Sequence, residues 1–236
     1  MKALKYLLSV SFILSICGGL AAQSKQDPVE IYGAGKDIVK LDYMQDPIDN
    51  SKRWIRADIV LDGRENPDKT AMTADEKRWI RDVVLDLTLV YYKPTAKTEQ
   101  ERWNPTNWIV LKSKASLVAI EAKKKSQVSF FIPCEIKDLY RLQDSQRLFF
   151  IIDLSVFGKK VELTKSNLKK YMSKTLSSKI RTMKQYDDLR ADLNKAAVSA
   201  DNWLVPLPDT PIYIQTKVYE DAQKSSYKMP FYKKEK

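Results

Sequence analysis

The chain of 236 residues contains no histidine, only two cysteines and only six glycines. The absence of histidine excludes Ser-His-Asp and Cys-His nucleophiles, imidazole ligands for zinc or copper, and imidazole proton transfer near neutral pH. Glycine is also too sparse for a phosphate loop: Gly33 to Lys36 lacks the second glycine at the right spacing and the Lys-Ser/Thr pair. An enzyme built on this chain is therefore restricted to carboxylates, lysine or a carboxylate-bound metal, and no cofactor is expected.

The first 22 residues have the composition of a secretory signal peptide. Lys2 and Lys5 precede an apolar run, and small residues end it at Ala22. No later stretch approaches the roughly 20 apolar residues of a spanning helix. The sequence therefore predicts export to the periplasm, the outer membrane or the cell surface. Lipidation of Cys17 is the alternative, although Ile16 stands where a lipid-modification signal has a small residue.

Cys134 is the only cysteine that follows this leader, so the exported chain has no intramolecular disulfide. It lies in an apolar stretch that begins at Phe130. We therefore expect its thiol to pack as a small hydrophobic group.

The charge balance is strongly basic, with 41 Lys and Arg against 30 Asp and Glu. Outside the cytoplasm, such a chain favours envelope or pilus proteins, acidic glycans or anionic headgroups as partners, and not nucleic acid. Solvated turns and helix faces are the simpler reading of its lysine runs. The candidate contact residues are Lys123, Lys124, Lys125, Lys159, Lys160, Lys233 and Lys234.

Apolar residues alternate over long stretches from Arg53 onward, which is typical of half-buried strands. Between Arg78 and Tyr92, one face carries only apolar side chains, and Asp82, Asp86 and Thr88 lie on the other. A single helical turn is expected at 135–140, and charged turns at 123–126 and 158–160. Strands are predicted at 29–32, 53–61, 78–92, 108–112, 115–122, 127–132, 148–157 and 212–219.

The apolar spacing changes to three and four between Thr164 and Ala200, which predicts one long amphipathic helix or two helices joined near Ser177 and Ser178. Thr164 or Ser166 is the expected cap. The predicted fold is mainly β: an antiparallel immunoglobulin-like β-sandwich with a helical insertion at about 164–200 before the last strand. The expected organisation is a signal peptide (1–22), an N-terminal extension (23–50), the sandwich (51–220) and a basic mobile tail (221–236).

The strands at 54–61, 79–92 and 148–153 resemble those of secreted immunoglobulin-like proteins encoded with type IV pilus-like machinery in Akkermansia-type Verrucomicrobia. The resemblance covers about half of the exported chain. It implies a surface or pilus-associated component without a catalytic site, and it supplies no functional residues. The chain departs from antibody-type domains because it lacks their Cys–Trp–Cys core.

Several residue patterns have a catalytic or binding interpretation beside a structural one. Ser166 and Lys169 match the Ser-x-x-Lys pattern of penicillin-recognising enzymes, without the other motifs of that family. The 62–68 loop has three acids for a calcium site, but turn chemistry explains them as well. Asp58, Asp82 and Asp86 lie on solvated strand faces and show no glycosidase pairing. The five tryptophans suit packing better than sugar stacking.

These observations predict an exported, non-catalytic interaction or structural protein of the cell envelope. The resemblance implies a pilus-associated role for it. A glycan- or anionic-polymer-binding module that uses the lysine-rich turns is the alternative. A carboxylate-based hydrolase is the remote one, because the sequence shows no paired carboxylates in a cleft.

Overall fold

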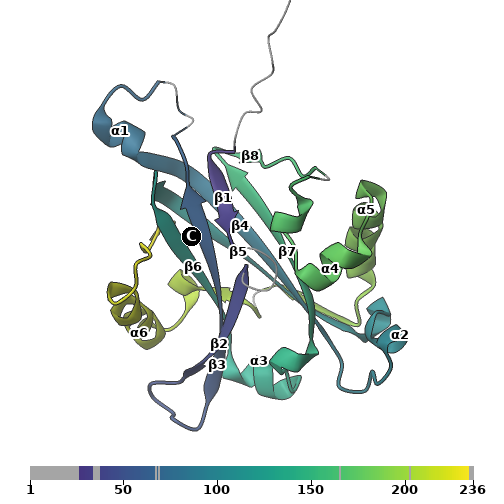
Figure 1. Ribbon diagram of the computed structural model, residues 1–236. Helices are drawn as coiled ribbons and strands as arrows, with labels where there is room; N and C mark the ends of the chain where they lie inside the picture. The colour runs from purple at the N-terminus through teal and green to yellow at the C-terminus, as the bar shows by residue number, and fades with distance from the viewer. Residues whose placement is uncertain are drawn as a thin grey trace, which may run out of the picture.

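The structure is a computed structural model that describes residues 27–33, 38–66, 68, 70–164, 166–201 and 203–233. The predicted signal peptide, Cys17 and Lys234 lie outside the described residues. Two β-sheets, one curled as a half-barrel, pack face to face, and helices surround them (Figure 1). The fold is thus β-rich as predicted, but it is a mixed α and β arrangement.

The first sheet has the order β1-β3-β6-β10, and β2 also pairs with β3. β1 pairs with the last four residues of β3 and β2 with its first seven, so together they form one interrupted edge strand. Residues 29–32 and 39–45 therefore belong to the first sheet. The strands are β1 (Val29–Tyr32), β2 (Val39–Gln45), β3 (Arg53–Gly63), β6 (Lys125–Ile132) and β10 (Val205–Pro206).

The second sheet has the order β11-β5-β4-β7-β8, and β9 also pairs with β5. All pairs are antiparallel except β5 with β9. One continuous strand covers the two predicted at 108–112 and 115–122. The strands are β4 (Trp79–Tyr92), β5 (Trp108–Glu121), β7 (Arg147–Val156), β8 (Lys159–Lys160), β9 (Val198–Asp201) and β11 (Phe231–Tyr232).

The core lies between the inner faces of the two sheets. On β4, the alternate residues from Val83 to Tyr91 are all fully buried, which confirms the predicted spacing. At Asp82 the backbone has a φ of 49°, and the pairing of β4 with β5 keeps the same register on both sides of it. The alternation is interrupted there: Ile80 and Val83 are buried, and Arg81 and Asp82 between them are exposed.

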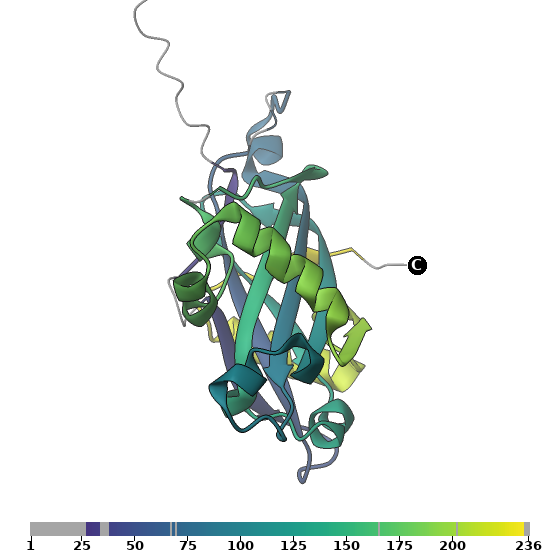
Figure 2. The same cartoon turned by 90° about the vertical axis from the view of Figure 1, so that its right-hand side faces the viewer.

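A second apolar cluster lies on the outer face of the second sheet, beneath the segment predicted as a long helix. Of the two predicted arrangements, a single long helix is wrong and two helices are present, but their junction lies at 180–182 and not near Ser177 and Ser178. The segment contains 3-10 turns at Leu168–Lys170 and Leu193–Lys195, α4 (Lys174–Lys179) and α5 (Met183–Asp192). Ser173 and Thr182 cap the two helices, not Thr164 or Ser166. The first break arises because the backbone of Tyr171 and Ser173 bonds to β7. In Figure 2, α5 lies diagonally across the sheet.

The C-terminal segment also differs from its prediction. Residues 212–219 belong to a helix, α6 (Ile212–Gln223), and not to a last strand. Ile214 and Val218 are fully buried one helical turn apart, whereas Ile212 is 74% exposed. The tail is not free along its length, because β11 pairs with β5.

The remaining helices are short. The turn of helix predicted at 135–140 is confirmed as α3, and Cys134 at its start is buried as expected. Thr73 and Thr98 cap the other two with reciprocal hydrogen bonds. No helix within the described ranges has the length and apolarity to span a membrane. The helices are α1 (Ala74–Arg78), α2 (Glu99–Arg102) and α3 (Cys134–Leu139), with 3-10 turns at Pro105–Asn107, Asp144–Gln146 and Leu207–Asp209.

Candidate functional site: a polar pocket on the second sheet

A polar pocket of about 660 Å³ opens on the outer face of the second sheet. Strands β4, β5, β7 and β8 form its floor, and the end of α5 with the following 3-10 turn forms one wall. Two carboxylates and four cations gather here from five elements. The polar side chains that line it include Asp86, Thr88, Lys112, Lys114, Asp153, Lys160, Arg190 and Asn194.

The register of the strands fixes the floor of this pocket. Asp86 on β4 lies directly opposite Lys114 on β5 and opposite Asp153 on β7. Side chains in such positions stand about 5 Å apart at their Cβ atoms, and like charges there destabilise the sheet. The Asp86–Asp153 pair therefore requires compensating cations.

Two cations compensate Asp153, which is 8% exposed. Lys160 Nζ lies 2.8 Å from its Oδ1 atom, and the Arg190 guanidinium lies 2.7 Å from its Oδ2 atom. Arg190 also donates a hydrogen bond to the hydroxyl of Tyr186, one turn earlier on α5. Through these contacts Asp153 links α5 and β8 to the sheet.

Asp86 has a different environment. Burial raises the pKa of its carboxyl, and the charge of Asp153 raises it further, while Lys114, Lys160 and Arg190 lower it. This carboxyl therefore binds its proton at a higher pH than an ordinary aspartate. It accepts hydrogen bonds when ionised and can donate one when protonated.

The structure does not bring together the three carboxylates weighed in the sequence. Asp58 lies on the other sheet, where Arg56 and the Ser129 hydroxyl hold it at 2.8 and 2.6 Å, and Asp82 is exposed where the alternation of β4 is interrupted. The partner of Asp86 is Asp153, which the sequence reasoning missed. The available signal was a single acid within the otherwise apolar 148–154 run.

Most of the described candidate contact lysines lie at one end of the molecule, and Lys233 lies apart from them after β11. The 123–125 turn and the β8 lysines lie at the same end of the molecule, as the strand directions in Figure 1 show. Lys160 alone among them lines the pocket. Lys125 Nζ lies 3.4 Å from the centre of the Tyr32 ring, and Lys233 follows β11.

The 62–68 loop does not assemble a calcium site from its described residues. The carboxylate of Asp68 accepts hydrogen bonds from the backbone and hydroxyl of Thr70, and Asp62 lies 3.7 Å from Arg64. Asn66 donates to two carbonyls around α1. No group of three potential metal ligands occurs in the described part of the chain.

Ser166 is the serine of the Ser-x-x-Lys pattern. Its hydroxyl contacts the hydroxyl of Thr164 at 2.8 Å.

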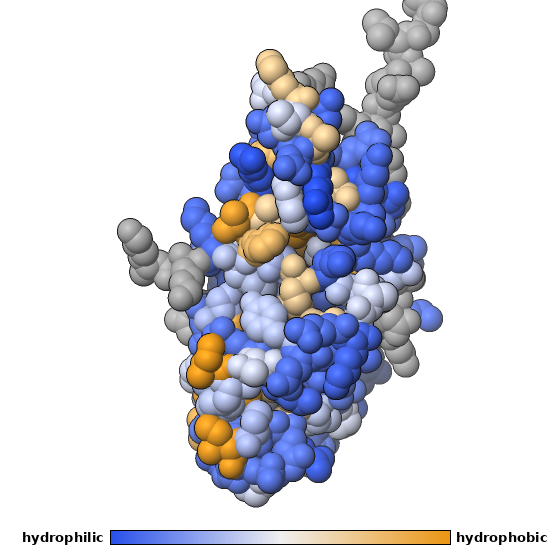
Figure 3. Space-filling model, turned by 90° about the vertical axis from the view of Figure 1, so that its left-hand side faces the viewer, coloured by the Kyte–Doolittle hydropathy of each residue, from blue (hydrophilic) through white to orange (hydrophobic). Residues whose placement is uncertain are grey.

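The tryptophans pack, as predicted. Trp54 and Trp108 are buried, and Trp79, Trp103 and Trp203 each contact another aromatic ring. On the face that carries α1 and α6, apolar side chains form small groups among polar ones (Figure 3). That surface has the mixed character of an ordinary exterior, in contrast to the concentrated charge of the pocket.

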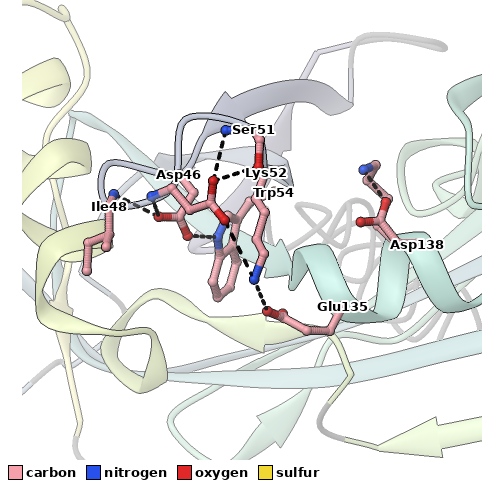
Figure 4. Close-up of polar contacts among 9 residues, drawn as sticks. Asp46, Ile48, Ser51, Lys52, Trp54, Glu135 and Asp138 are labelled. Atoms are coloured by element: carbon pink, nitrogen blue, oxygen red, sulfur yellow. Dashed lines mark hydrogen bonds and ion pairs between the residues drawn. The ribbon is translucent and has the colours of Figure 1, made fainter.

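A second polar cluster, at the turn between β2 and β3, is structural. The Asp46 carboxylate, 5% exposed as a residue, accepts hydrogen bonds from Trp54 Nε1 at 2.8 Å and from the backbone of Ile48 and Asp49 (Figure 4). Nearby, Lys52 Nζ lies 3.7 Å from Glu135 on α3. These contacts close the turn and fix it against the neighbouring helix.

The comparisons with known proteins give a likeness of fold. No protein-family model matches the chain, and no curated protein matches it. A crystal structure of a protein from Akkermansia muciniphila is similar, with a TM-score of 0.55 and 11% identity, over 88% of this chain and 95% of that one. The predicted resemblance to Akkermansia proteins is thus confirmed at the level of a β-rich fold that this chain shares with one of them.

Proposed function

We propose that this chain is an exported, non-catalytic protein that works by binding an acidic partner in the cell envelope. A pilus-like assembly is the setting that the sequence resemblance suggests, and an acidic glycan is the other candidate partner. The predicted signal peptide and the absence of histidine support export and a non-catalytic role.

The charge arrangement of the polar pocket carries this proposal. Four cations and two carboxylates are among its described lining residues, and Lys160 and Arg190 are bound to Asp153. Lys112 and Lys114 lie opposite Thr88 and Asp86 on β4, so the described lining has more cationic than anionic side chains. A concave surface with surplus positive charge attracts and orients an acidic partner.

The buried Asp46 and the half-buried Asp58 serve the fold. Trp54 and the turn backbone bind Asp46, and Arg56 and Ser129 bind Asp58. Carboxylates held by such hydrogen bonds and ion pairs have a structural role and are not positioned for acid–base catalysis.

Crosslinking in intact cells followed by purification of the tagged chain tests the proposal. We expect an envelope partner that is released by salt and lost in the charge-reversed Lys112→Glu, Lys114→Glu double variant. Lys124→Glu, in the turn between β5 and β6 and not among the pocket's lining residues, is the control. Recovery of a free monomer only, after crosslinking, would contradict the proposal.

A carboxylate-based hydrolase is the second candidate, because Asp86 and Asp153 are cross-strand neighbours in an open pocket. Burial and the charge of Asp153 raise the pKa of Asp86, and a carboxyl with a raised pKa can act as a general acid. Turnover of acidic or neutral glycans by the wild type, abolished in Asp86→Asn with the fold intact, would establish it. Wild-type protein that binds without turnover supports the non-catalytic role instead.

A further inference from the structure

We propose that the groove between the 168–172 segment and the junction of α4 with α5 binds an anionic membrane lipid, with an acyl chain in the groove and the headgroup on its basic rim. This α4–α5 groove shares no lining residue with the polar pocket, so the inference goes beyond the proposed function. The groove lies at the first residue of α5, whereas the polar pocket lies beside the last turn of that helix.

Aliphatic side chains give the α4–α5 groove its apolar surface. Leu168 and Met172 are buried, and Ile180 and Met183 are half-buried where α4 ends and α5 begins. The volume of the groove is about 370 Å³, which lies within the roughly 300–1,000 Å³ of small-ligand sites. Methionine side chains are flexible and adapt to irregular shapes, so this lining suits a flexible acyl chain.

Two cations line the same groove. Lys169 and Arg181 are both exposed, and neither side chain forms an ion pair or hydrogen bond with another described residue. Their neighbours Lys170 and Lys179, by contrast, each form an ion pair with a glutamate. The lining contains no carboxylate, and the sequence from 163 to 186 contains no acidic residue. The rim of the groove is therefore positively charged and suits an anionic headgroup.

The neutral polar groups of the groove already have partners within their own helices. The Ser177 hydroxyl donates a hydrogen bond to the carbonyl of Lys174 at 2.9 Å, and the Thr182 hydroxyl accepts one from the Gln185 amide at 3.2 Å. A bound peptide needs hydrogen-bond partners for its backbone, and a sugar needs them for its hydroxyls. The groove instead combines an apolar surface with two cations, which is complementary to an anionic amphiphile.

Further cations on the same segment favour a lipid in a membrane over a free fatty acid. Lys174 on α4 and Lys184 on α5 are exposed, and neither side chain has a partner among the described residues. A free fatty acid carries one charge, whereas an anionic membrane surface attracts every basic residue close to it. The predicted export of the chain brings it into contact with the membranes of the envelope.

Co-sedimentation of the full exported chain with phosphatidylcholine vesicles, prepared with and without phosphatidylglycerol, tests the inference. We expect binding only when the anionic lipid is present, and high salt should weaken it. Lys169→Ala and Arg181→Ala should each weaken binding about fivefold, because each removes one basic residue from the membrane contact. The double variant Lys124→Ala, Lys159→Ala removes two charges outside the groove and is the charge-matched control for the double variant of the rim; it should weaken binding far less.

Occupation of the groove by an acyl chain requires a second measurement. Ile180→Gln keeps the charge and makes the lining polar, so it should weaken vesicle binding several-fold. The methyl NMR signals of Met172, Ile180 and Met183 should shift when monomeric short-chain phosphatidylglycerol is added to the wild type. Circular dichroism of each variant shows whether it is folded.

Binding to phosphatidylcholine alone, or equal weakening by the control double variant, would overturn the inference. Methyl signals that phosphatidylglycerol leaves unchanged would also overturn it. If polyglutamate shifts these signals in place of the lipid, or if laurate shifts them without any binding to vesicles, the groove binds an acidic peptide or a free fatty acid and the lipid assignment fails. Envelope crosslinks at the polar pocket are a separate readout, so failure of this inference leaves the proposed function standing.

Discussion

Replacing Asp46 by alanine should destabilise the protein more than any other single change in the turn between β2 and β3. The substitution removes three hydrogen-bond acceptor contacts at once, from Trp54 Nε1 and from two backbone amides. Because Trp54 is 6% exposed, its indole N–H has little access to water once its partner is gone. A buried donor left without a partner costs about 1–3 kcal/mol, and hydrogen bonds to a charged group add to this.

We therefore expect Asp46→Ala to lower the free energy of unfolding by about 2–4 kcal/mol. For a protein of this size, each kcal/mol lowers Tm by about 2–4 °C. Urea unfolding followed by tryptophan fluorescence measures the change, because Trp54 reports on the same site. Asp42→Ala is the matched control: that exposed carboxylate on β2 accepts one local hydrogen bond, and its loss should change stability by about 0.5 kcal/mol or less.

The effect should depend on pH in a defined direction. Burial raises the pKa of Asp46, but hydrogen bonds from the Asp49 amide, Trp54 and the Ile48 amide outweigh burial and hold the pKa below its usual range. A lowered pKa in the folded state contributes stability above the unfolded value of about 3.9 and loses it as the pH falls through the folded value. The difference between wild type and Asp46→Ala should thus be largest near neutrality and shrink in strong acid. A constant difference between pH 7 and pH 2 would refute the reasoning.

Four further changes test other parts of the structure. Ile214→Ala should cost about 2–5 kcal/mol in urea unfolding, because its side chain is fully buried, whereas Ile212→Ala should be nearly neutral; equal effects would restore the strand interpretation of this segment. Gly63→Ala should destabilise by about 1–3 kcal/mol, since its Cβ would stand 2.6 Å from the carbonyl oxygen of Glu121, and a thermal melt unchanged from wild type would show that the backbone can yield. Asp86 has a raised pKa, so its ionised form lowers the free energy of unfolding above that pKa, and the wild type should become more stable as the pH falls through it. Asp86→Asn should have an equal or higher free energy of unfolding near neutrality, and this increase with falling pH should be smaller in the variant. Arg190→Ala should increase hydrogen exchange in α5 before the sheet itself is affected, and uniform protection of α5 would exclude its anchoring by Asp153.

The strands could be predicted from sequence because their alternation reports directly on burial. The face of β4 from Val83 to Tyr91 and the apolar run of β7 both required a layered core. The interruption of the alternation at Asp82 was not visible, because an aspartate near a strand start has no distinctive pattern when the pairing partner is unknown. The pairing of β1 and β2 with β3 was also missed, since β2 contains few apolar residues and forms an edge.

The segments after Val156 were the least predictable. Apolar spacing gave the correct helical faces between 168 and 193, but the breaks depend on backbone hydrogen bonds to β7 that only the folded chain supplies. In α6, Ile212, Ile214 and Val218 fit either an alternating strand or a helix, and packing beside Trp54 and Phe131 decides for the helix. Local pattern does not resolve such short apolar runs.

The candidate site was predicted only in part. The sequence identified Asp86 as an outward-facing residue of its strand and Lys160 as a candidate contact, and both line the pocket. The sequence did not predict that Asp153, Lys112 and Lys114 belong to the same site. Strand register places them there, because it sets residues from distant parts of the chain opposite one another. Arg190 belongs to a helix whose docking on the sheet no sequence pattern specifies.

Site-specific photocrosslinking in intact cells tests most directly whether this protein works by binding at the pocket. A photoreactive amino acid in place of Asn194, on the pocket wall, should yield an adduct with an envelope component, and high salt should reduce it. The same amino acid in place of Ile212, exposed on α6, is the control position. Adducts from position 212 with none from position 194 would place the contact elsewhere and contradict the account.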